Sequence, residues 1–102
     1  MAREATVGLW VKIEALPGKE EEVAAFLKQG AELAQQEAET VRWFGVRIGP
    51  TTFGVFDAFP DDSGRKAHLN GEIAKALLGS VGTLVEEPAI HEFDVLAEKD
   101  PA

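Results

Sequence analysis

The segment that most constrains the fold is residues 53–60, FGVFDAFP, in which every residue before the proline except Asp57 is apolar or glycine. A strand with one solvent-exposed face alternates apolar and polar residues with a period of two, and this segment does not. Both of its faces need cover, and a chain of 102 residues rarely supplies two covering layers by itself. The pattern therefore predicts that a second copy of the chain covers one face of the sheet.

Hydrophobic periodicity divides the rest of the chain into strands and helices. Strands are predicted over 6–16, 41–49, 52–59 and 89–97, and helices over 18–38 and 64–79. The second helix is expected in two pieces that meet near Asn70 and Gly71, with residues 61–63 offering its N-terminal cap. The order β-α-β-β-α-β predicts one α+β domain over 1–102, with its core at about 6–97 and a ferredoxin-like antiparallel sheet.

Charge and cysteine content exclude several classes of protein. The chain has 10 basic and 18 acidic residues, a net charge of -8, which disfavours partners such as nucleic acid or an anionic membrane surface. It has no cysteine, so disulfides, thiolate metal sites and a cysteine nucleophile are excluded. No apolar stretch resembles a signal peptide or a membrane span, and a cytoplasmic location is expected.

Two histidines, His68 and His91, are the side chains whose unperturbed pKa values lie near neutral pH. His68 precedes the inward-facing Leu69, so it is a candidate proton donor or acceptor in a pocket between helix and sheet. The alternative is a partly buried histidine bonded to a backbone carbonyl or to solvent. His91 is expected in a side-chain pair across the sheet or at a dimer contact. The two histidines lack metal-ligand spacing, so no metal site is expected.

Trp10 and Trp43 are the largest side chains, and each is either a stacking platform for a planar ligand or an anchor of the core or interface. Arg42 and Arg47 lie on opposite faces of one strand, so they cannot bind one anion together. Asp57 on an apolar strand face needs a partner. Because Arg47 lies across the hairpin, a structural Asp57–Arg47 ion pair is favoured over a general base.

The chain resembles the antibiotic biosynthesis monooxygenase domain family over about residues 6–97. The residues that carry the resemblance are Pro17-Gly18-Lys19 before a glutamate-rich helix, 41–44 at the start of a strand, 53–59 before an acidic turn, and 66–69 with a His-Leu pair. The resemblance implies a ferredoxin-like protomer in a homodimer, a dimeric α+β barrel. It also implies relatives that include cofactor-independent oxygenases of aromatic compounds, haem-degrading proteins and isomerases.

By this resemblance His68 is expected to be catalytic, and Trp10, Trp43 and Asn70 are expected to contact a small aromatic or quinone-like ligand, with no cofactor or metal. The chain departs from the family where residues 70–72 replace a proline and a second histidine, and where Leu77 and Leu78 replace a haem-ligating histidine. Haem cleavage is therefore disfavoured. The expected function is a cofactor-independent monooxygenase. A non-catalytic dimeric ligand-binding or structural protein and an acid-base isomerase remain open.

Overall fold

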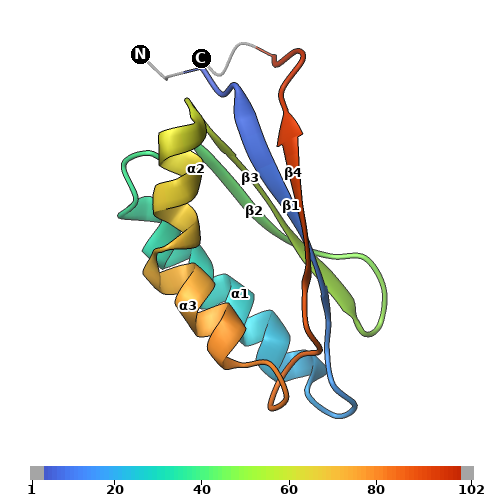
Figure 1. Cartoon of the computed structure of the whole chain (residues 1–102). Helices are drawn as coiled ribbons and strands as arrows, with labels where there is room; N and C mark the ends of the chain where they lie inside the picture. Colours follow the sequence, from blue (N-terminus) through green and yellow to red (C-terminus); the bar gives the residue numbers. More distant parts are fainter. Residues whose placement is uncertain (1–3, 100–102) are drawn as a thin grey trace.

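An antiparallel sheet and a layer of helices on one of its faces make up the fold (Figure 1). The computed structural model describes residues 4–99, so the ends of the predicted domain, 1–3 and 100–102, lie outside the described residues. The elements in chain order are β1 (Val7–Glu14), α1 (Glu20–Gln35), β2 (Arg42–Arg47), β3 (Thr52–Phe59), α2 (Asp62–Leu69), α3 (Glu72–Gly79) and β4 (Ala89–Asp94). The strand order is β2-β3-β1-β4. The predicted ferredoxin-like α+β fold is confirmed.

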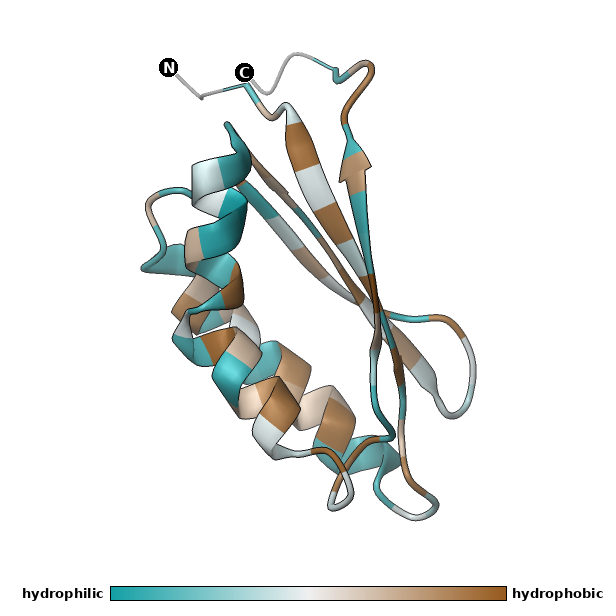
Figure 2. Ribbon diagram, viewed as in Figure 1, coloured by the Kyte–Doolittle hydropathy of each residue, from teal (hydrophilic) through white to brown (hydrophobic). Residues whose placement is uncertain are grey.

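The core lies between the sheet and the helices, where the inward-facing residues of the two central strands, β1 and β3, are buried. In β1, Leu9, Val11 and Ile13 point towards the helices and are buried. Alternate positions of β3 do the same, with Phe53 and Phe59 almost fully enclosed. Figure 2 shows the resulting bands of apolar and polar residues along β1. The core thus fixes which residues of β3, including Asp57, face the helical layer.

The other face of the sheet carries an aromatic row that no described helix covers. Phe44 of β2 lies opposite Phe56 of β3, Phe56 lies opposite Trp10 of β1, and Trp10 lies opposite His91 of β4. Phe93 stacks on Phe56 with ring centroids 5.2 Å apart. Phe44 is 54% exposed and Phe56 is 40% exposed. The pattern that predicted two apolar faces for β3 therefore leaves one apolar face open in the single chain.

The starts, the break and the buried residues of α2 and α3 largely follow the local sequence. Asp61 accepts a hydrogen bond from the Gly64 amide at 2.9 Å, so α2 begins two residues before the predicted start at 64. The predicted break near Asn70 and Gly71 is confirmed, since it separates α2 from α3. In α3, Ile73 and Leu77 are buried against the sheet, whereas Ala76 is exposed.

Gly8 in β1 is expected to tolerate no side chain. A Cβ there would lie 2.5 Å from the Asp57 carbonyl oxygen and 2.3 Å from the Phe93 ring. Because a paired strand backbone cannot retreat, Gly8→Ala should lower the free energy of unfolding by about 1–3 kcal/mol in urea titrations. Gly79→Ala is the control, since nothing lies within 4 Å of a Cβ there. Equal stability of the two variants would show that the sheet can relax around residue 8.

Candidate functional site

His68 lies on the inner face of α2 and is held between two carboxylates. Its Nδ1 is 2.6 Å from Glu37 Oε1, in the segment after α1, and its Nε2 is 2.9 Å from Asp57 Oδ2 on β3. The side chain is 7% exposed, and the Phe59 ring lies 5.2 Å from the imidazole, centroid to centroid. Three segments far apart in the sequence therefore meet at one imidazole.

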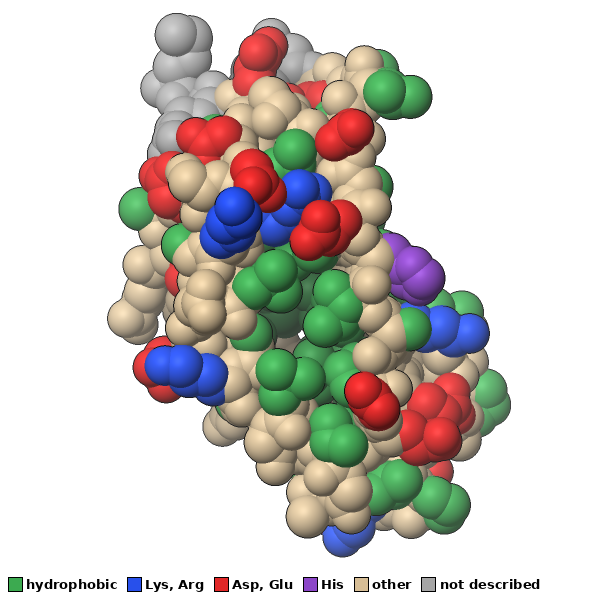
Figure 3. Space-filling view, viewed as in Figure 1, with side chains coloured by type: hydrophobic (Ala, Val, Ile, Leu, Met, Phe, Trp, Pro, Cys, Tyr) green, Lys and Arg blue, Asp and Glu red, His purple; other side chains and the backbone are tan. Residues whose placement is uncertain are grey.

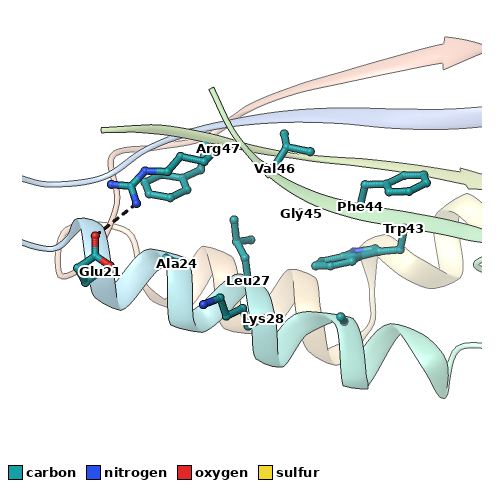
Figure 4. A pocket seen from close by; sticks show the side chains of 11 residues that line it. Glu21, Ala24, Leu27, Lys28, Trp43, Phe44, Gly45, Val46 and Arg47 are labelled. Atoms are coloured by element: carbon teal, nitrogen blue, oxygen red, sulfur yellow. Dashed lines mark hydrogen bonds and ion pairs between the residues drawn. The ribbon is translucent and has the colours of Figure 1, made fainter. Parts of the chain in front are cut away.

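The predicted ion pair between Asp57 and Arg47 is wrong. The register of the β2–β3 hairpin places Arg47 opposite Phe53 and places Trp43 opposite Asp57. Arg47 instead lies over the Phe53 ring at 4.9 Å and pairs with Glu21 of α1 at 3.3 Å (Figure 4). Asp57 is therefore too far along the strand to meet Arg47, and His68 from the helical layer takes its place.

Burial and charge set the protonation of this group. Burial raises the pKa of the Asp57 carboxyl, and the hydrogen bond and charge of His68 offset only part of that rise. For His68, burial alone would lower the pKa, but the hydrogen bonds and charges of Asp57 and Glu37 outweigh burial and raise it above its ordinary value. The pair therefore holds a proton more firmly than an exposed histidine does, and it is suited to acid-base chemistry.

Three buried polar atoms of Asp57 and its cross-strand neighbour Trp43 lack a well-formed hydrogen bond within residues 4–99. Asp57 is fully enclosed, and its Oδ1 has no partner within residues 4–99, while the contact from Oδ2 to Nε2 is close without the alignment of a regular hydrogen bond. The indole Nε1 of Trp43, which lies opposite Asp57 on β2, is likewise buried and unpartnered in this part of the chain. An unpaired donor and an unpaired acceptor thus occupy neighbouring positions on the sheet.

His68 separates two hollows of different character. The inner pocket, about 50 Å³, lies between the sheet and the α2–α3 pair. Apart from His68 its walls are apolar: Leu9, Val11, Val55, Leu69, Ile73, Ala74, Leu77, Leu78 and Ile90. Leu78 and Ile90 are about half exposed. Figure 3 shows apolar side chains gathered in the opening between the helical layer and the sheet.

The outer hollow, about 360 Å³, lies between the segment that follows α1 and the α2–α3 pair. Glu37, Glu39 and Glu72 give it an acidic wall. Among the residues that the structure describes, His68 alone lines both the inner pocket and the outer hollow. The imidazole therefore stands at the partition between an apolar space and an acidic one.

Arg65 closes the site at the end of the sheet. It is 8% exposed and donates hydrogen bonds to the carbonyl oxygens of Gly8 and Phe93 at 3.3 and 3.2 Å. Its guanidinium also pairs with Asp62 at 2.9 Å and with Glu92 at 3.5 Å. Arg65 thus fastens α2 to β1 and β4 and fixes the position of His68 one turn later.

The structure brings only part of the predicted site together. Trp43 is the cross-strand neighbour of Asp57, and its indole packs where a Cβ on Gly30 would lie 3.1 Å away. Trp10 lies on the opposite face of the sheet from His68, over Gly54. Asn70 is exposed at the end of α2 and donates to the Lys66 carbonyl oxygen at 2.9 Å. The substrate-contacting roles of these three residues stay predictions.

A larger groove, about 510 Å³, lies between α1 and β2, but it offers fewer side chains suited to acid-base chemistry (Figure 4). Its arginine, Arg47, is already engaged by Glu21 and by the carbonyl oxygens of Gly49 and Pro50. Its remaining walls are mostly apolar side chains and backbone. We therefore place the candidate site at His68 rather than in this groove.

Sequence reasoning missed Glu37 and Arg65. Arg65 precedes His68 by three residues on the helix, a spacing that puts both on one face and could have indicated a polar inner surface. Glu37 follows α1 in an irregular segment, and no local pattern marks it. Within residues 4–99 no three acidic or histidine side chains converge to hold a metal ion. In the same part of the chain, no helix has the length and apolar character needed to cross a membrane.

Several solved structures share this fold at low sequence identity. The structure is similar to a crystal structure named antibiotic biosynthesis monooxygenase, at 14% identity and TM-score 0.76. It is also similar to a structure from Nitrosomonas europaea named "putative antibiotic biosynthesis monooxygenase", at 16% identity and TM-score 0.79. These alignments cover 89% of this chain and 99% of the other chain in both cases. PA3566 from Pseudomonas aeruginosa is similar at 21% identity and TM-score 0.78, over 92% of this chain and 97% of that one. The class is therefore an α+β protein with an antibiotic biosynthesis monooxygenase-like fold.

A nearer relative shows the family. NE2512 from Nitrosomonas europaea, a protein of unknown function, is 47% identical to this chain, with TM-score 0.92 over 96% of each chain. The chain belongs to the same family as NE2512. No family model and no curated protein matches the sequence.

Proposed function

We propose that this protein is a homodimeric, cofactor-independent monooxygenase that acts on a small aromatic or quinone-like compound in the inner pocket. The observation that carries the proposal is the buried His68–Asp57 pair at the wall of an otherwise apolar pocket. An apolar pocket with few polar groups is typical of small-molecule sites. The names of the distant structures with this fold support the same class of reaction.

The unpaired atoms beside His68 support a ligand with a polar group. A ligand hydroxyl near Asp57 Oδ1 and Trp43 Nε1 would donate to the carboxylate and accept from the indole, whereas a carbonyl oxygen would pair with the indole N–H only. The apolar walls would enclose the rest of the compound. Since the pocket is only about 50 Å³, a two-ring compound requires the mouth at Leu78 and Ile90 to widen.

The reaction needs a base and an acid but no bound cofactor. A methylene beside an aromatic carbonyl loses one proton to the His68–Asp57 pair, and the electron pair of the broken C–H bond stays on carbon. This carbanion gives one electron to O₂, and the resulting carbon radical and superoxide join in a C–O bond. The peroxide O–O bond then breaks as the second C–H proton is lost. One oxygen remains as the new carbonyl and the other leaves, with both protons, as water.

The test fills the inner pocket without touching His68. Ala74→Phe places a ring in the pocket, whereas Ala76→Phe adds the same ring to the exposed side of α3. With anthrones and dihydroxynaphthalenes as probes, we expect O₂ consumption by the wild type and by Ala76→Phe, and little by Ala74→Phe. His68→Gln should lower the rate by about 10²–10⁴-fold, the usual contribution of an acid-base group.

Other results would redirect the proposal. Equal O₂ consumption by Ala74→Phe and Ala76→Phe would remove the inner pocket from the reaction. Probe binding by calorimetry without O₂ consumption would favour the non-catalytic binding protein. An isomerised product formed without O₂ consumption would favour the acid-base isomerase.

A further inference from the structure

No sequence pattern marks Glu37 as part of the site, yet its carboxylate contacts both His68 and Thr40. Its Oε1 is 2.6 Å from His68 Nδ1 and also accepts a hydrogen bond from the Thr40 hydroxyl at 2.7 Å. The Glu37 side chain is 22% exposed, whereas Asp57 on the other side of the imidazole is fully enclosed. Glu37 therefore connects the buried His68–Asp57 pair to solvent.

The two contacts of His68 require two protons. A neutral imidazole has one N–H, so one of its nitrogens would present a lone pair to a carboxylate oxygen. Both short contacts are favourable only when each has a proton between its nitrogen and its oxygen. The group Glu37–His68–Asp57 therefore holds one proton more than a neutral histidine with two carboxylates, and that proton can reside at either end.

The charges around His68 favour proton exit on the outer side. Glu37 and Glu39 face it from the segment after α1, Glu72 from the start of α3, and Asp57 from β3. On α2 itself, Arg65 and Lys66 each form an ion pair with Asp62, and Arg65 also pairs with Glu92 of β4. No lysine or arginine lines the described wall of the outer hollow. An open hollow with an acidic wall is suited to receive a proton.

We propose that Glu37, His68 and Asp57 form a proton relay that carries protons between the inner pocket and the outer hollow, with Glu37 as the residue that exchanges with solvent. The relay starts from the state in which the extra proton has left to water, so that Asp57 is ionised and His68 is neutral with its one proton on Nδ1. A bound compound's C–H or O–H bond breaks, its electron pair stays on the compound, and its proton passes to Asp57, which lies enclosed behind Leu9, its cross-strand partner in the pocket wall. The free Nε2 of His68 takes that proton from Asp57 while Nδ1 gives its own proton to Glu37, which releases it to water. The catalytic use of the relay rests on the proposed function, but the relay itself does not.

The proposal is tested by NMR on the full chain with labelled histidine, without any substrate. Glu37→Gln keeps an acceptor for His68 Nδ1 but removes the charge and the exchangeable carboxyl. We expect His68 to titrate at lower pH in this variant. We also expect its ring N–H protons to exchange with water more slowly, by up to about 10²-fold, the lower end of the usual contribution of an acid-base group. Glu72→Gln is the matched control, a carboxylate of the same wall that is not one of the two that contact His68, and it should leave both properties unchanged.

Two outcomes would overturn the relay. One is a Glu37→Gln variant whose His68 titration and exchange match the wild type. The other is a lowered titration with unchanged exchange, which would make Glu37 a charge partner only. Thr40→Val offers a second variant, since it removes the hydroxyl that orients Glu37 and should slow exchange with the carboxylate still present. Absence of O₂ consumption with every probe would contradict the proposed function and leave these NMR results intact.

Discussion

His68→Leu is expected to lower the free energy of unfolding by about 3–5 kcal/mol at pH 7, the usual cost of removing one partner from a buried ion pair. The reason lies in Asp57, which is fully enclosed and has His68 as its charged neighbour. Leucine fills a similar volume, so the loss would come from the unpaired carboxylate rather than from a cavity. Urea titration monitored by tryptophan fluorescence measures it.

The loss should depend on pH in a defined direction. In the wild type, His68 has a raised pKa, so its stabilising contribution is full below its unfolded pKa and is lost as pH rises through its folded pKa. In His68→Leu, burial and the charge of Glu37 act on Asp57 with no His68 to oppose them, and they raise its pKa further. Asp57 then becomes neutral as pH falls, so the difference from the wild type should shrink in acid and be largest at neutral pH.

A double variant separates charge from packing. Asp57→Leu combined with His68→Leu removes both buried charges and leaves Glu37 partly exposed to solvent. Replacing a buried pair by apolar side chains is often neutral or stabilising by about 1–4 kcal/mol. The double variant should therefore be more stable than His68→Leu alone. If both variants lose the same stability at every pH, the pair does not carry the charge described above.

The fold was predictable because its signals are local. The strand at 53–59 is apolar on both faces, and β1, whose residues do alternate, pairs with it along the whole strand. The cap at Asp61 and the break at Asn70 and Gly71 are likewise set by residues next to one another in the sequence. Helix and strand bounds shifted by only a few residues because caps and frayed ends decide them.

The site was predictable only in part because its contacts join distant segments. His68 stood out by residue type and by its place before Leu69. Its partners did not, since the contacts to Asp57 and Glu37 depend on how α2 lies over the sheet and on the path of the chain after α1. The Asp57–Arg47 pairing failed because the register of a hairpin decides which side chains meet, and that register cannot be counted from the pattern of apolar residues alone.

The two faces of β3 have different surroundings. Its side of the strand builds the core and holds the imidazole, whereas Phe56 and its aromatic neighbours on the other side remain open to solvent in the single chain. A row of four strands, each six to eight residues long, presents roughly 400–500 Å² per chain. Two such faces together approach the roughly 1,000 Å² that a specific interface needs.

Phe56→Glu is expected to convert a dimer into a monomer. We propose that the wild type pairs through this sheet face and sediments at twice the 11.0 kDa chain mass at micromolar concentration. In a two-fold dimer each substitution acts twice. Losing about 2 kcal/mol of burial per phenylalanine would weaken association about a thousandfold. Leu33→Glu on α1, where the leucine is 39% exposed against 40% for Phe56, is the matched control and should stay dimeric. A wild-type species of 11.0 kDa would refute the paired-sheet arrangement.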